Sequence, residues 1–203
     1  MKEDLSGTYC ACMEGVKSRL AVVSAVTEAQ LSTGSELFDY EFVSLQLRKS
    51  LELVAFASMT ANRKIYAEAH ANFASHWRAK ALLNSLGKIH PDFYPQPIEL
   101  DHVKEFGAKH FKTVEGGYLT REDFVTLYDL CSEALHTWNP FTDKERHIDF
   151  KRSVAEWVQK MERLLRLHLM RFVDREEIWV VHMAYPEDGK VHAFTAAPSS
   201  KAI

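Results

Sequence analysis

Residues 35–59 read SELFDYEFVSLQLRKSLELVAFASM, and they carry the strongest indication of the fold. Ser35 followed by Glu36 is typical of a helix start, because a serine at the cap accepts a hydrogen bond from the first turn. Beyond Leu45, apolar residues fall on nearly every face of the predicted helix. Since a helix that is apolar all round is buried on several sides, we expect this one at the centre of a helical bundle.

Four more segments show the three- and four-residue spacing of apolar side chains that indicates helices. They are residues 10–31, about 64–88, 119–139 and about 143–173. Thr120 and Asp123 form a near capping box at the start of the third of these segments. Between the second and the third, residues 90–98 contain three prolines, so we expect them to pack as a non-helical strap.

Near the end of the chain, the spacing of apolar residues changes from a helical period to that of strands, which predicts a β-hairpin. Residues 177–185 and 190–197 are rich in Val, Trp, Tyr, Phe and Thr. Between them lies Pro186-Glu187-Asp188-Gly189, a turn sequence in which Pro presets φ and Gly accepts a positive φ. Because both faces of this hairpin carry apolar residues, we expect it to be covered by the rest of the protein or by another subunit.

A four-residue loop also fixes a predicted register for the hairpin. It pairs Met183 with His192 and Val181 with Phe194. His182 and His192 would then lie on opposite faces, which argues against a shared metal.

These patterns predict a mainly α protein, a helical bundle of five to six helices with a C-terminal β-hairpin. We expect residues 1–175 to form the bundle and residues 176–203 to form a hairpin appendage packed on it, within one structural domain.

Composition narrows the class of protein. The chain has 203 residues, a formal net charge of −3 with His neutral, and three cysteines, so it is no polycation that wraps nucleic acid. An odd number of cysteines without a zinc-ribbon partner set fits a reducing compartment. The first residues lack the apolar core of a signal peptide, and no stretch reaches the roughly 18 uncharged apolar residues of a membrane span. We therefore expect a cytoplasmic protein with no membrane segment.

Two Arg–His pairs are candidates for metal-free RNA cleavage, in which His transfers a proton and Arg binds the phosphate. Arg63 and His70 are seven residues apart, which returns them to nearly one face of a continuous helix. Arg163 and His168 are five residues apart, roughly 140° around a helix. His168 also falls on the predicted apolar stripe, which favours a core histidine. With ten histidines in the chain, chance pairs of this kind are expected.

Metal and cofactor sites are not indicated. Glu133 and His136 form one ExxH, but di-iron bundles need two such pairs and two more glutamates. Cys10 and Cys12 are too close together for the usual zinc knuckle. We expect no metal and no cofactor.

Residues 144–175 are locally basic. Nine basic and five acidic residues give this predicted helix a net charge of +4 in a protein of −3. A solvated helix face is the commoner meaning of such a pattern. The alternative is a binding site for RNA or for an acidic partner surface.

Three stretches together resemble a group of uncharacterised bacterial proteins: RKSLELVAFASMTANRKIYA (48–67), HPDFYPQPI (90–98) and LYDLCSEALHTWNPF (127–141). The third is also similar to the Leu-His helix end of HEPN-like helical bundles. That superfamily includes metal-free RNases of toxin and phage-defence systems, and members without catalysis. Its motif is an Arg followed, after four to six residues, by a His. If His136 is the equivalent residue, the motif is broken, because the six residues before it contain no Arg.

Two functions follow as hypotheses. The first is a non-catalytic helical interaction module of a bacterial system, binding a protein partner or itself as a homo-oligomer. The second is a HEPN-like metal-independent RNase of a toxin or phage-defence system. The broken motif at His136 and the acidic net charge favour the first, so an enzyme is the less expected outcome.

Overall fold

The fold combines helices with a five-stranded sheet. The computed structural model describes residues 4–63, 79–101, 110–137, 141, 152–172 and 176–197. Within them the helices are α1 (Leu5–Thr27), α2 (Glu36–Ala61), α4 (Ala79–Ile89), α5 (Arg121–Leu135) and α6 (Val154–Leu165). The strands are β1 (Gln96–Asp101), β2 (His110–Thr113), β3 (Leu167–Arg171), β4 (Ile178–His182) and β5 (His192–Ala196). The expected helical bundle closed by a single hairpin is therefore wrong in its finer form, and the protein is mixed α/β.

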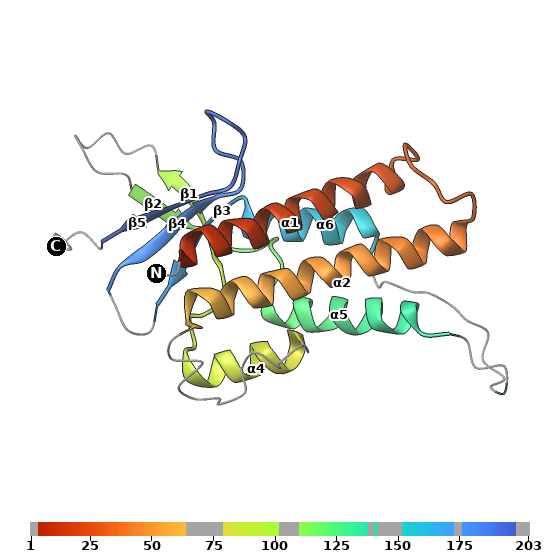
Figure 1. Cartoon of the computed structure of the whole chain (residues 1–203), viewed down its shortest axis with the longest axis horizontal. Coiled ribbons are helices and arrows are strands. Elements are labelled where there is room, and N and C mark those ends of the chain that lie inside the picture. Colours follow the sequence, from red (N-terminus) through yellow and green to blue (C-terminus); the bar gives the residue numbers. More distant parts are fainter. Residues whose placement is uncertain are drawn as a thin grey trace.

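The helices pack around α2. Figure 1 shows α1 and α5 on opposite sides of α2, with α4 near its C-terminal end and α6 close to α1. The buried face of α2 includes Leu47, Leu51 and Val54, all fully enclosed. Tyr9, Met13 and other α1 side chains complete the same core. The central position predicted for residues 35–59 is confirmed. No helix in the described ranges is long and apolar enough to cross a membrane.

All neighbouring strands of the sheet are antiparallel, in the order β2-β1-β3-β4-β5. The last long helix was expected to continue to about residue 173. Helix α6 ends at Leu165 instead, and strand β3 follows it. Over residues 167–171, side chains alternate between the helix-covered face and the opposite face of the sheet. Pairing of β3 with β4 over five residues stabilises the strand here.

The hairpin is present, but its register differs from the prediction by one residue. His182 pairs with His192, and Val180 pairs with Phe194. At the loop, the backbone N–H of Tyr185 donates to the carbonyl of Lys190, as a four-residue loop requires. One extra residue on the first strand, a β-bulge between His182 and Tyr185, accounts for the shift.

The bulge changes which face of the sheet the residues of the second hairpin strand occupy. Trp179 faces the helices and lies edge-on to Tyr9 and Phe172, with ring centroids 5.5 Å and 4.8 Å away. Phe194 lies on the opposite face and is 41% exposed. His182 and His192 share that opposite face, so their predicted separation is wrong.

The ends of the later helices follow local sequence signals. Thr120 accepts a hydrogen bond from the N–H of Asp123, which completes the predicted capping box of α5. Ser153 and Glu156 form a second capping box that starts α6. Helix α4 coincides with the end of the helix expected over 64–88, and residues 64–78 lie outside the described residues. The strap over 90–98 leads into β1, and its Phe93 is fully buried.

Candidate functional site

The first predicted pair falls only partly within the described residues. Arg63 is partly buried just after the end of α2, whereas His70 lies outside the described residues. The structure therefore does not place this pair, and its role stays a prediction.

His168 is a core histidine. It is fully buried on β3, and its Nε2 lies 2.7 Å from the hydroxyl of Tyr9. Its Nδ1 lies 2.7 Å from the carbonyl oxygen of Leu165, which can only accept, so Nδ1–H donates there and Nε2 accepts from Tyr9. Burial lowers the pKa of His168 to about 4. Both ring nitrogens are thus occupied inside the core, away from any substrate.

Arg163 and His136 lie on the surface in different places. Arg163 is exposed on α6 and lines a groove of which His168 is not a part. His136 is exposed at the C-terminal cap of α5, with its backbone N–H bonded to the carbonyl of Glu133. Within the described residues no His, Cys, Asp and Glu side chains group in a way that could hold a metal ion.

The basic segment does not form one helix. Its described part consists of α6 followed by β3. Lys160 forms an ion pair with Asp123, with a 2.6 Å separation, and the guanidinium of Arg152 lies 5.6 Å from the ring centroid of Trp157. The expected basic helical face over 144–175 is therefore wrong for these residues.

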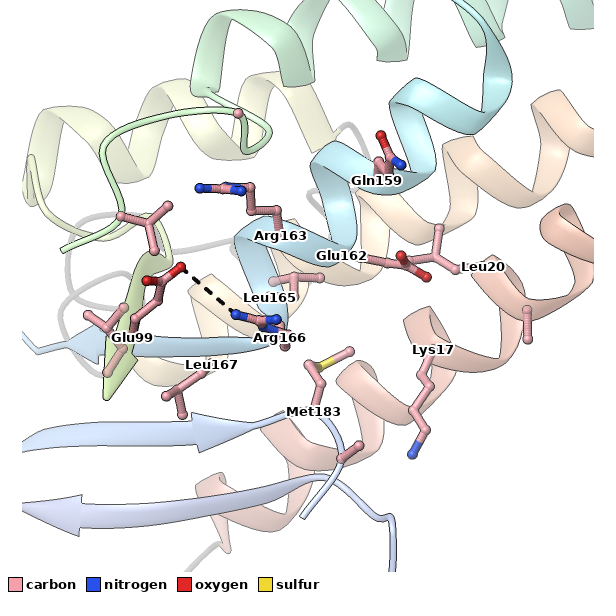
Figure 2. Close-up of a pocket in the computed structure, with 15 residues that line it drawn as sticks. Lys17, Leu20, Glu99, Gln159, Glu162, Arg163, Leu165, Arg166, Leu167 and Met183 are labelled. Atoms are coloured by element: carbon pink, nitrogen blue, oxygen red, sulfur yellow. Dashed lines mark ion pairs between the residues drawn. The ribbon is translucent and has the colours of Figure 1, made fainter. Parts of the chain in front are cut away.

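A groove of about 820 Å³ lies between α1, α6 and the start of the sheet. Its floor is apolar and includes Leu20, Ile98, Leu165 and Met183. Figure 2 shows Leu20, Leu165 and Met183 among the side chains that line the groove, with Met183, just after β4, between Lys17 and Arg166. A volume of this size is within the range of small-molecule sites.

Charged side chains stand at the edge of this groove. Arg166 reaches Glu99 only at 3.9 Å, and its own side chain is 77% exposed. Figure 2 shows Arg163 and Arg166 extending from the end of α6, and Glu162 extending toward α1. Lys17 donates to the carbonyl of Gly189, which ties α1 to the hairpin turn.

Gly117 makes room for Arg163. Its φ is +72°, a conformation that L side chains rarely adopt, and a Cβ there would lie 3.3 Å from Nε of Arg163. The turn at Gly116-Gly117 therefore also leaves space for a cation at the groove.

A second surface feature lies on the helical hairpin, at the opposite end from the sheet. Eight large apolar side chains are exposed in the described residues, and five of them belong to the α1–α2 turn and the first half of α2: Leu31, Leu37, Phe38, Tyr40 and Leu45. Phe38, Phe42 and Leu45 lie within about 60° of one another around α2, and we call them the α2 stripe. Phe38 is 56% exposed, which is unusual for a phenylalanine.

Comparison with protein-family models, with curated proteins and with solved structures gave no match to this chain. The functional argument therefore rests on the groove and on the α2 stripe.

Proposed function

We propose that this protein is a non-catalytic interaction module that binds a second copy of itself through the α2 stripe. The observation that supports it is the concentration of exposed apolar side chains on this one part of the surface. Contiguous apolar surface on a folded protein marks an interaction site more often than chance exposure does.

The charges along α2 favour a second copy as the occupant. In the first two turns of the helix, Glu41 is the acidic residue on the side of the stripe, whereas Glu36 lies on the opposite side and Asp39 accepts hydrogen bonds from Ser32 and Thr33. Lys49 is exposed about two turns further on, whereas Arg48 pairs with Glu52 and lies over the ring of Tyr128 on α5. When two α2 helices pack antiparallel, the acidic end of each stripe lies over the basic end of the other, which makes the surface self-complementary, as a two-fold interface requires.

The first prediction concerns the molecular mass. We expect wild-type protein to sediment at twice 23.3 kDa, and the double variant Phe38→Ser/Leu45→Ser to sediment as a single chain. Phe194→Ser is the matched control, because Phe194 is 41% exposed but lies on the sheet. A wild-type protein that stays monomeric at high concentration, or a double variant that still dimerises, would contradict the proposal. Circular dichroism of each variant establishes that it is folded.

A further inference from the structure

We infer that the groove between α1, α6 and the sheet binds a small amphipathic anion, whose apolar body lies on the floor and whose acidic head lies between Arg163 and Arg166. This site is separate from the α2 stripe, since no stripe residue lines the groove.

The apolar part of the inference rests on the composition of the groove. Its floor is provided by four different parts of the fold, including Leu20 of α1, Ile98 of β1, Leu165 of α6 and Met183 after β4. Each of these parts is held in place by the core or by the sheet, so the groove is largely preformed. Burial of an apolar body here gains about 25 cal/mol per Å² removed from water.

The charged part rests on the two arginines. Arg163 and Arg166 are three residues apart, so they are neighbours on the helix surface. Arg163 forms no hydrogen bond or ion pair with another of the described residues, and Arg166 has only the long contact with Glu99. Two such guanidinium groups suit a carboxylate or phosphate, which accepts paired N–H bonds.

The carboxylates of Glu162 and Glu99 restrict where the acidic head of the ligand can bind. Glu162 extends toward α1, away from Arg163 and Arg166, so it would repel an anion placed on that side (Figure 2). The side chain of Glu99 is 36% exposed. Among the described residues, Arg166 is its one ion-pair partner. An incoming acidic head therefore replaces Glu99 at Arg166, while the chain of the ligand runs over Leu165 and Met183.

The experiment uses decanoate, decyl phosphate and neutral decanol as probes, with binding to the full chain measured by calorimetry. We expect one or both anions to bind at least about tenfold more tightly than decanol, since hydrogen bonds to charged groups are the stronger ones. Preference between the two anions tells a carboxylate ligand from a phosphate one.

Variants locate the site. Arg163→Gln should weaken anion binding about tenfold or more, and Arg171→Gln should leave it unchanged, because Arg171 is exposed on β3 outside the groove. Ala184→Trp, at an exposed position of the lining, should block binding of all three probes without removing a core side chain. Anion binding that is absent, equal to that of decanol, or unaffected by both Arg163→Gln and Ala184→Trp would overturn the inference. Each of these variants is expected to sediment at the same molecular mass as wild-type protein.

Discussion

Replacing Trp157 with alanine is expected to lower the free energy of unfolding by about 3–5 kcal/mol, the usual cost of removing a buried tryptophan. Trp157 is 1% exposed and has the largest fully buried side chain among the residues that the structure describes. It belongs to the main core together with residues of α1, α2 and α5. A cavity in that place would therefore weaken the packing of α6 against α1 and the sheet.

Urea denaturation measures this loss directly. Gln159→Ala on the same helix is the control, because Gln159 is exposed and its replacement should change stability by no more than about 0.5 kcal/mol. A loss below about 1 kcal/mol for Trp157→Ala would show that this face of α6 is not part of the core.

His168 is expected to make the protein less stable as the pH falls from about 6.5 toward 4. Burial lowers its pKa to about 4 in the folded state, against 6.5 for an ordinary histidine. Between these values the unfolded chain binds a proton that the folded chain does not, so acid favours unfolding. For one such group, the loss between pH 7.5 and pH 5 is about 2 kcal/mol.

The double variant Tyr9→Phe/His168→Leu tests this assignment. It removes the hydroxyl and the imidazole together, so that neither is left buried without its partner. We expect its unfolding free energy to fall with pH by about 2 kcal/mol less than that of wild type over this range. Equal pH dependence in the two proteins would mean that another group is responsible.

The helices with clear end signals could be predicted from sequence. The start of α5 at Thr120 and the central position of α2 both follow from local patterns, namely a capping box and apolar residues on most faces. The burial of Trp157 also follows from a local pattern, because apolar neighbours repeat around it at helical spacing. His168 was also interpreted correctly as a core residue, although its stripe belongs to a strand and not to a helix.

The sheet could be predicted only in part, because long-range pairing determines most of it. Residues 167–171 are too few to separate a period of two from a period of 3.6. Their strand conformation depends on β4 and on Gln96 and Pro97 of β1, which are far away in the sequence. The capping box at Ser153 and Glu156, by contrast, was a local signal that marks the true start of α6 and was overlooked.

Neither of the two surface sites was identified from the sequence. The groove combines Leu20, Ile98, Arg163 and Met183, which only the completed fold brings together. Phe38 and Leu45 belong to the apolar pattern of residues 35–59, from which burial on several sides is expected. Their exposure shows the limit of such a pattern. It predicts that the side chains are buried, but it does not distinguish burial within the same chain from burial against another chain.

The central claim is that two copies of this chain pair antiparallel through α2, and a charge exchange tests it most directly. Lys49→Glu and Glu41→Lys each place like charges together twice in such a pair, so each variant alone should sediment as a monomer. An equimolar mixture restores both opposite-charge contacts, and we predict that it sediments at twice the mass of one chain. A mixture that stays monomeric while wild type dimerises, or single variants that dimerise as well as wild type, would contradict this arrangement.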